Sequence, residues 1–376
     1  MPLTEFRGSQ LTRRAILRAA GAACAVGAMP CMPAHAQDQR PLTVVQIVDL
    51  SPLHQDVSRD FFVGSRAAWT DINARNGGIR GRAVQHVVLE TDGSEQAVRA
   101  AWQAAQENPS CVVLSGCASD SVAAAIAALQ SDSPTMAHAA PWLHRKWLDK
   151  SDTVFHIFPD YQAQISHAIR SLAVMGVQQA GAVFASQVLQ QQLQDLVSEA
   201  GKSEGLRIQT LSAIGGNSAP PAMVLFIGGT PELHDYVTRL ALPQGRQCFV
   251  IALADVNLQV LAQLGGIPRN ISVIATQAVP LVTSGMSIVR NYRDVMSRLY
   301  DEPPSPQGLA GFIAARYTAE VMASVSGPIT RANLLSAFRK RAEIRIGGYT
   351  VTYRDRKLSH SQVTQSMLTS DGRIVG

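Results

Sequence analysis

Cysteine and histidine are the residue types in this sequence that could bind a metal ion, form disulfide bonds or supply a nucleophile. The chain of 376 residues has 5 cysteines and 9 histidines. The cysteines that follow the N-terminal leader are odd in number and lack paired spacing, which argues against a disulfide framework: Cys111, Cys117 and Cys248. The central histidines are spread over expected strand, loop and helix, without the spacing of a metal site: His138, His144, His156 and His167. We therefore expect neither a metal nor a cofactor.

The motifs of the common enzyme classes are missing from the sequence. It has no Gly-x-Ser-x-Gly elbow, no Walker loop, no Cys-x-x-Cys and no His-Glu-x-x-His, and no Gly-x-Gly-x-x-Gly follows the first expected strand. The formal net charge is +5, and much of it comes from arginines within the first 36 residues. Because no basic stripe is interleaved with aromatic residues, a nucleic-acid partner is not expected. The sequence favours a binding protein over an enzyme.

The first 36 residues have the features of an export signal. Arg13-Arg14 precede an apolar stretch rich in Ala and Gly, residues 19–29, and Ala34-His35-Ala36 gives the small-x-small pattern that a signal peptidase needs. The paired arginines resemble a twin-arginine signal; the alternative is an ordinary secretory signal with two chance arginines. Either signal places the mature protein in the periplasm. No later segment has about 18 uninterrupted apolar residues, so stable membrane insertion is not expected.

The elements that must position any site alternate between strand and helix. In the first part of the mature chain, strands are expected at residues 42–48, 84–90, 111–115 and 134–138, and helices at 61–76, 95–107 and 122–129. The pattern restarts after residue 160, with strands at 180–184, 223–227, 249–252 and 271–275, and helices at 165–175, 189–199, 234–240 and 256–264. Such alternation with short connections predicts two parallel sheets, each covered by helices on both faces. Two long amphipathic helices, at 286–300 and 308–326, and a strand or hairpin near 349–353 complete the chain.

Several motifs, in the order of the chain, resemble those of the leucine/isoleucine/valine-type binding proteins. Residues 73–82 (NARNGGIRGR) are similar to that family's helix end and the turn after it. Further similar segments lie at residues 91–94, 114–119, 154–160, 275–280 and 309–316. The resemblance implies an α/β fold of two doubly wound parallel-sheet lobes joined by a three-crossing hinge, the type I periplasmic binding protein fold. Residues 37–158 plus 281–345 would form the N-terminal lobe, and residues 159–280 plus 346–376 the C-terminal lobe.

The resemblance also implies a function and partners. Proteins of this family capture an amino acid or a related small molecule in the cleft between the lobes and deliver it to an ABC importer. A small-molecule ligand and an ABC permease are therefore the expected partners of a monomeric periplasmic protein that is not an enzyme. The alternative is a ligand-sensing or accessory periplasmic protein on the same fold without a role in transport.

Ligand groups are expected in loops that follow the strands, because ligands of open α/β sheets bind beyond the carboxyl ends of the strands. On the resemblance, the candidate ligand-binding residues of the first lobe are Ser51, Ser119, Asp120, Ser121, His138, Ala139 and Trp142. Those of the second lobe are Thr230 and Asp255.

Departures from the family pattern bear on the ligand. A serine that holds the ligand's carboxylate in the family is replaced by Asp120, which would repel a carboxylate. Asp120 either faces a cationic or amine-bearing ligand or caps the helix that follows it. Trp142 either stacks on the ligand or fills the hinge. The aromatic residue that usually follows a Gly-Gly pair is Thr230 here, and Asp255 is a second acid that could bind an ammonium group.

Overall fold

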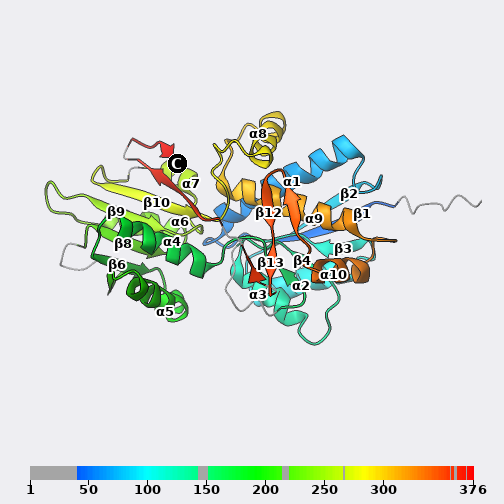
Figure 1. Ribbon diagram of the computed structural model, residues 1–376, viewed down its shortest axis with the longest axis horizontal. Coiled ribbons are helices and arrows are strands. Elements are labelled where there is room, and N and C mark those ends of the chain that lie inside the picture. Colours follow the sequence, from blue (N-terminus) through cyan, green and yellow to red (C-terminus); the bar gives the residue numbers. More distant parts are fainter. Residues whose placement is uncertain are drawn as a thin grey trace, which may run out of the picture. The chain divides into compact units, whose positions relative to one another are not determined.

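Apolar, β-branched runs of the sequence form the inner strands of two separate sheets in the computed structural model (Figure 1). The structure describes residues 40–142, 151–213, 220–265, 267–355, 357–359, 362–369 and 371–376. The expected export signal, with Arg13, Arg14, Ala34 and Ala36, lies outside the described residues. From residue 40 onward the chain forms one compact unit, which contains both sheets.

The first sheet comes from the first part of the chain, and its strands are all parallel. The strand order is β2-β1-β3-β4-β5. All eight residues of β1 are buried, as expected of a strand covered on both faces. The bounds are β1 (Leu42–Asp49), β2 (Val84–Thr91), β3 (Cys111–Leu114), β4 (His138–Ala139) and β5 (Val154–Phe155).

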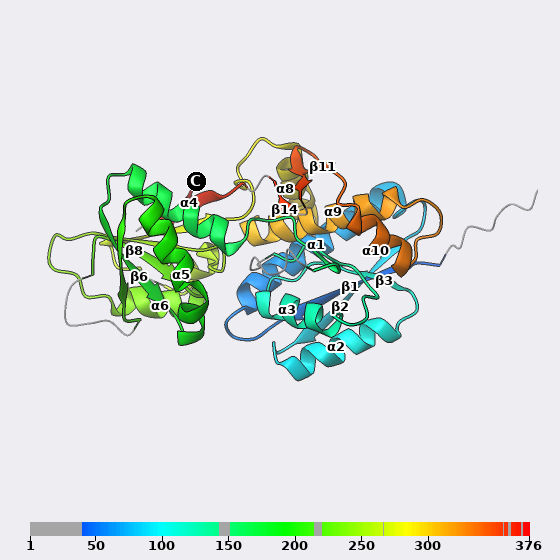
Figure 2. The same ribbon diagram turned by 60° about the horizontal axis from the view of Figure 1, so that its bottom comes forward.

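Helices cover both faces of the first sheet (Figure 2). One face is packed by α2 (Glu95–Glu107) and α3 (Asp120–Leu129). The other face is packed by α1 (Gln55–Asn76), α9 (Pro306–Ser324) and α10 (Arg331–Arg339), and α8 (Ser287–Leu299) contacts α1 and α9. Helices α8 and α9, from the last third of the chain, thus complete the lobe formed by its N-terminal part.

The helices α1 and α9 approach so closely that their crossing requires glycine. A Cβ atom added to Gly311 would lie 1.8 Å from the carbonyl oxygen of Phe61, and one added to Gly64 would lie 1.8 Å from that of Gly308. Any side chain at these positions would push the two backbones apart, because interiors are already packed to near crystal density.

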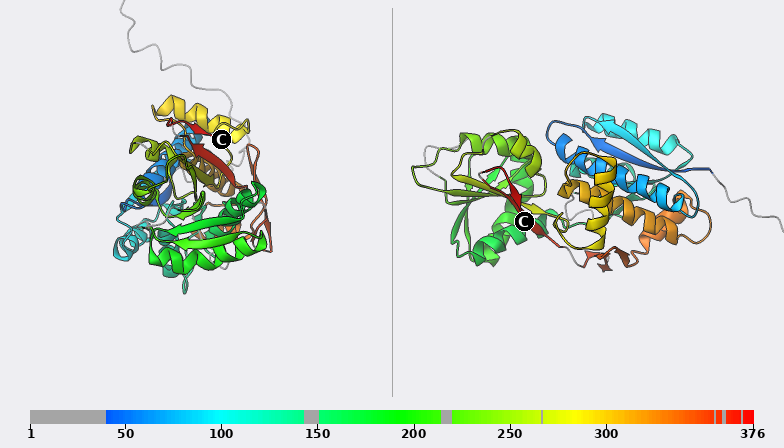
Figure 3. Two further views of the ribbon diagram at one scale, coloured as in Figure 1. Left: turned by 90° about the vertical axis from the view of Figure 1, so that its left-hand side faces the viewer. Right: turned by 90° about the horizontal axis from the view of Figure 1, so that it is seen from above.

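The second sheet repeats the arrangement of the first and adds two strands from the C-terminus. Its order is β16-β15-β10-β9-β8-β6-β7, in which β15 pairs antiparallel with both β10 and β16 and the other pairs are parallel. Its bounds are β6 (Gln179–Phe184), β7 (Arg207–Leu211), β8 (Met223–Ile227), β9 (Cys248–Ala252), β10 (Ile271–Gln277), β15 (Thr364–Leu368) and β16 (Ile374–Val375). Helices α4 (Tyr161–Val174) and α5 (Gln187–Ser203) cover one face, and α6 (Thr230–Arg239) and α7 (Leu258–Gln263) cover the other (Figure 3).

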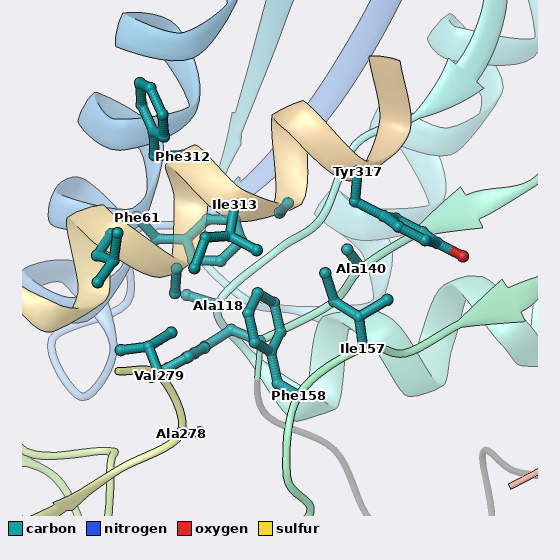
Figure 4. Close-up of a cluster of buried hydrophobic side chains, with 14 of the residues drawn as sticks. Phe61, Ala118, Ala140, Ile157, Phe158, Ala278, Val279, Phe312, Ile313 and Tyr317 are labelled. Atoms are coloured by element: carbon teal, nitrogen blue, oxygen red, sulfur yellow. The ribbon is translucent and has the colours of Figure 1, made fainter. Parts of the chain in front are cut away.

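The chain passes between the two sheets three times. The first passage follows β5, the second follows β10, and the third leads into β15. Ile157 and Phe158 of the first passage and Val279 of the second share one buried cluster with Phe61 and Ile313 (Figure 4). The predicted α/β class with two doubly wound lobes is confirmed.

The chain end before β15 packs on the first passage. A hairpin of β11 (Ile344–Ile346) and β12 (Tyr349–Val351) is followed by a second of β13 (Tyr353–Arg354) and β14 (Lys357–Leu358). The Tyr349 hydroxyl donates to the carbonyl of Ile157 (2.7 Å), and the Tyr353 hydroxyl donates to that of His156 (2.6 Å). The first hairpin therefore lies beside α9 of the first lobe. The sequence analysis assigned residues from 346 onward to the second lobe. The full division of the chain into lobes stays a prediction.

Some elements differ from the sequence expectation for local reasons. The edge strand β7 was not predicted, because it is short and three of its five residues are exposed. The helix α1 begins six residues before the expected start, since Val57 is the single apolar residue of its otherwise polar first turn. The three cysteines in the described residues are free and buried, and burial raises the pKa of Cys111 and Cys248 to about 11.

Candidate functional site

A cavity of about 340 Å³ lies where loops of the two lobes meet. Its volume is near the lower end of the range typical of small-molecule sites. The first lobe contributes Leu53, His54, Asp120 and Ser121. The second contributes polar groups and an apolar wall: Tyr161, Ala185, Ser186, Val188, Leu189, Gln192, Leu193, Ile227, Gly228, Gly229, Glu232 and Asp255.

The strand order explains why the cavity forms at this place. In the first sheet, β1 lies between β2 and β3, and the chain leaves β1 and β3 toward opposite faces. The same switch occurs in the second sheet between β6 and β8. Loops diverge at such points and leave a crevice beyond the carboxyl ends of the strands. Loops after β1, β3, β6, β8 and β9 all reach the cavity, so it occupies the switch points of both lobes.

A second hollow, of about 610 Å³, lies beside β1 and β2 rather than at both switch points. Its lining includes Arg59, Asp60, Glu90 and Glu302. Hydrogen bonds between the lobes occur next to it: the Asn257 amide donates to Asp60 (3.0 Å). We take the cavity at the switch points as the candidate site.

Asp255 is an acid of the candidate site with a raised pKa. It follows β9, and its Oδ1 accepts a hydrogen bond from the Tyr161 hydroxyl (2.6 Å). Its Oδ2 is buried without a hydrogen-bond partner in the described part of the chain. Burial is the main cause that raises its pKa to about 6; the charge of Asp120 adds to the increase, while the Tyr161 hydrogen bond and His54 oppose it. A carboxylate in this position is costly unless a donor or cation reaches it.

His54 comes to the site on the loop after β1. Its Nδ1 lies 3.4 Å from a carboxylate oxygen of Asp49 and 3.2 Å from the hydroxyl of Ser51. These contacts orient the imidazole ring, and the opposite side of the ring is directed away from Asp49. Ser51 itself lies outside the cavity lining and supports His54.

The turn before α3 separates the roles of three consecutive polar residues. Ser119 is the N-cap: its hydroxyl accepts from the amide of Val122 and lies 2.8 Å from the hydroxyl of Ser121. The helix cap is therefore Ser119, and the cap interpretation of Asp120 is wrong. Asp120 is the first residue of α3 and lines the cavity together with Ser121.

Other candidates lie in the core rather than in the cavity lining. His138 and Ala139 form the buried strand β4, and burial lowers the pKa of His138 to about 4. Trp142 is fully buried, and its ring lies 5.0 Å from that of Phe158, so it fills the hinge core. The described start of the loop after β4, residues 140–142, thus packs in the core and does not line the cavity.

Thr230 is also fully buried, and its hydroxyl is hydrogen-bonded to other groups of the protein. Its hydroxyl donates to Asp56 of α1 (2.5 Å) and accepts from the amide of Asn257 (2.9 Å). The residue joins the lobes next to the cavity and does not line it.

Tyr161 and Glu232 line the cavity but were not singled out from the sequence. Tyr161 is the first residue of α4, directly after the Asp160 cap of the first passage. The signal that could have found it is an aromatic residue placed immediately after the expected crossing. Glu232 lies in the first turn of α6, where an acid is also explained by the positive end of the helix dipole.

No group of three or more metal-binding side chains occurs among the described residues. Within the same residues, none of the helices combines the length and the apolar character that a membrane span requires.

Comparison with known proteins places this geometry in a family. Residues 41–225 match the family model described as periplasmic binding protein. The sequence matches none of the curated proteins with which it was compared.

Solved structures with the same fold include a substrate-binding periplasmic protein from Ralstonia solanacearum, at 19% identity and a TM-score of 0.75, covering 89% of this chain and 99% of that one. A leucine binding protein from Thermotoga maritima is similar at 13% identity and a TM-score of 0.73, covering 89% and 97%. A fatty acid ABC transporter substrate-binding protein from Thermomonospora curvata is similar at 15% identity and a TM-score of 0.71, covering 89% and 91%. Residues 41–225 thus belong to the periplasmic binding protein family, and the chain has the fold of a type I periplasmic binding protein.

Proposed function

We propose that this protein is the periplasmic solute-binding component of an ABC importer and captures an amino acid or a related small molecule between its two lobes. The observation that carries the proposal is the cavity of about 340 Å³ to which both lobes contribute loops. A site divided between two bodies responds to its ligand by closing, since the ligand gains contacts only when both halves are engaged.

The side chains of the cavity favour binding over catalysis. Ser51 is hydrogen-bonded to His54, but Ser51 lies outside the cavity lining, and it and Asp49 contact the same ring nitrogen. A nucleophile, base and acid acting in sequence would instead use both nitrogens of the ring. The Asp255–Tyr161 pair holds an acid in place and leaves one carboxylate oxygen for a ligand. Export through the Arg13-Arg14 signal and delivery to a permease complete the proposed role.

The structural neighbours support a small molecule as the ligand but do not identify it. The similar structures include a leucine binding protein and a fatty acid ABC transporter substrate-binding protein, so one fold accommodates chemically different solutes.

A ligand-sensing or accessory role on the same fold is the second candidate. The hydrogen bond from Thr230 to Asp56 favours this role. On the family resemblance, Thr230 was expected to bind the ligand, but here its hydroxyl contacts the other lobe. Neighbouring permease and ATPase genes would support import, and a neighbouring sensor kinase gene would support sensing.

A thermal-shift screen tests the proposed function. Purified protein is heated with amino acids, amines, small carboxylates and aromatic acids, each in large excess. A ligand at a hundred times its Kd adds about 2.7 kcal/mol of stability, which is readily measured. A shift with one chemical class supports solute capture. No shift with any class, from folded protein shown to be free of bound ligand, would contradict it.

A further inference from the structure

Side-chain hydrogen bonds join the two lobes on one side of the candidate site. They connect the start of α1 and the region where α9 begins, in the first lobe, with the starts of α6 and α7 in the second. The donor and acceptor pairs are Thr230 to Asp56 (2.5 Å), Asn257 to Asp60 (3.0 Å), Gln307 to the carbonyl of Val256 (3.1 Å) and Gln259 to the carbonyl of Pro304 (3.0 Å). Because every partner belongs to the protein, these contacts hold the lobes together whichever solute is captured.

Two of these acceptors, Asp56 and Asp60, are carboxylates that lie one turn apart on the same face of α1, where like charges repel each other. Their donors Thr230 and Asn257 are fully buried in the contact. Within the described chain, no lysine or arginine lies within ion-pair distance of either carboxylate. The Oδ1 atom of Asp56 is buried without a hydrogen-bond partner among the same residues. The lobes are thus joined through two acids whose charge no cation neutralises.

The contact between the lobes alters the protonation of both acids. Burial is the main cause that raises the pKa of Asp56 and Asp60, while the hydrogen bonds that they accept oppose the increase. Separation of the lobes would return both groups to water and move their pKa toward the ordinary value of 3.8. Joined lobes therefore hold these protons more tightly than separated lobes do. By linkage, the resulting stabilisation of joined lobes is complete below that ordinary value and is lost as the pH rises through the raised pKa.

Other titratable groups surround the two acids. His54 lowers the pKa of Asp56, and Glu302 raises that of Asp60. The further groups of the first lobe near Asp60 are Arg59, Glu90 and Tyr292. On the second lobe, Glu232 lies in the first turn of α6 and Asp255 precedes α7, which itself has no titratable side chain. Substitution of Asp56 and Asp60 alone leaves all of these groups in place, so their own titration is common to wild type and variant.

We propose that Asp56 and Asp60, with their partners Thr230 and Asn257, form a pH-sensitive latch that holds the two lobes together in acid and lets them separate more readily near neutral pH. The inference goes beyond the proposed solute capture, because it concerns the equilibrium between joined and separated lobes and not the ligand. A solute enters between separated lobes and is enclosed by joined ones. The latch therefore makes the free energy that a ligand must supply for closure depend on acidity.

Small-angle X-ray scattering of purified protein, shown to be folded and free of bound ligand, tests the latch. The radius of gyration reports the separation of the lobes, and it is measured between about pH 7.5 and about pH 4.5. We expect it to decrease as the pH falls, because the fraction of molecules with joined lobes increases. A carboxyl group whose pKa differs by one unit between two arrangements changes their ratio by up to about tenfold. A radius of gyration that stays constant or increases toward acid pH would overturn the inference.

The double variant Asp56→Asn/Asp60→Asn assigns the pH dependence to the latch. Asparagine keeps a side-chain oxygen that accepts a hydrogen bond but carries no charge at any pH. At neutral pH the variant should have the smaller radius of gyration that wild type reaches in acid, and it should lose most of the pH dependence. The matched control is Asp195→Asn, an exposed acid on α5 away from these contacts, which should behave as wild type does.

The single variants Asp56→Asn and Asp60→Asn replace the double variant if it does not fold, and each should lose part of the pH dependence. A folded variant that keeps the full pH dependence of wild type would overturn the latch. Because these measurements use no ligand, that result would leave the proposed solute capture to be decided by the thermal-shift screen.

Discussion

Asp56 and Thr230 lie 174 positions apart in the sequence, and the Thr230 hydroxyl donates a 2.5 Å hydrogen bond to the Asp56 carboxylate. One turn further along α1, Asp60 accepts from the Asn257 side chain (3.0 Å). Two acids on one face of a first-lobe helix thus contact the starts of α6 and α7 in the second lobe. Acids at helix starts are favoured by the helix dipole, and burial raises the pKa of both carboxyl groups. The pair of contacts ties the lobes together beside the candidate site.

Thr230→Val should weaken this contact between the lobes. The substitution removes the donor to Asp56 and the acceptor of the Asn257 amide, and a buried polar group left unsatisfied costs about 1–3 kcal/mol. We expect a lower Tm and a weaker ligand affinity, because the closed arrangement loses stability. Thr238→Val is the control, since this exposed threonine of α6 bonds only within its own helix in the described structure. If the two variants behave alike in both measurements, the contact does not tie the lobes.

Asp255 should make the ligand-free protein less stable as the pH rises from about 4 to about 6. Its pKa rises from 3.8 in the unfolded chain to about 6 in the fold, so the folded protein holds the proton over this interval and the unfolded chain does not. Asp255→Asn should reduce this slope, since Asp56 and Asp60 also have raised pKa values and remain. It should raise the Tm at neutral pH by about 2–4 °C for each kcal/mol regained. Tyr161, His54 and Asp120 act on the same carboxylate and remain in the variant. Thermal melts across this pH interval give the comparison, with Asp195→Asn, an exposed acid of α5 outside the cavity lining, as control. Identical slopes for wild type and Asp255→Asn would contradict the assignment.

The affinity for a ligand with an ammonium group should also depend on pH. The ionised form of Asp255 attracts an ammonium group, so this affinity should fall as the pH decreases through about 6. Titrations of an amine-bearing compound from the ligand screen, on either side of this pH, measure the change. A constant affinity, in protein that stays folded throughout, would show that Asp255 does not contact the cation.

Gly311→Ala should destabilise the first lobe. Its new Cβ would lie 1.8 Å from the carbonyl oxygen of Phe61, and overpacking of this kind costs about 1–3 kcal/mol. The control is Gly285→Ala, where an added Cβ meets nothing within 4 Å. Denaturant unfolding measures both free energies. A Gly311→Ala variant as stable as its control would mean that α1 and α9 are not packed this closely.

The sequence predicted the strands and most helices because their signals are local. The runs of buried residues at β1, β3 and β8 need no tertiary information, and the loops after them follow from the strand ends. Loops after β1, β3, β6, β8 and β9 contribute residues to the cavity, as the rule for open α/β sheets predicts. Ala139 and Trp142 after β4 do not line it, because both side chains are enclosed in the core.

The roles of single polar residues depend on partners that are distant in the sequence. A Ser-Asp-Ser run contains three possible helix caps, and only the backbone path selects Ser119. Thr230 donates to Asp56 instead of lining the cavity, and no local sequence pattern reveals this contact between the lobes. The hydrogen bond from Tyr161 to Asp255 also connects residues that lie 94 positions apart, so no local pattern predicts it.

The most direct test of ligand capture between the lobes compares two exposed valines. Val188 lines the mouth of the cavity, whereas Val174 ends α4 outside the cavity lining. The affinity of the best compound from the ligand screen is measured by calorimetry for wild type, Val188→Trp and Val174→Trp. We predict that Val188→Trp loses at least about tenfold in affinity, or about 1.4 kcal/mol, while Val174→Trp binds as wild type does. Full affinity in folded Val188→Trp protein would contradict the assignment of this cavity as the ligand site.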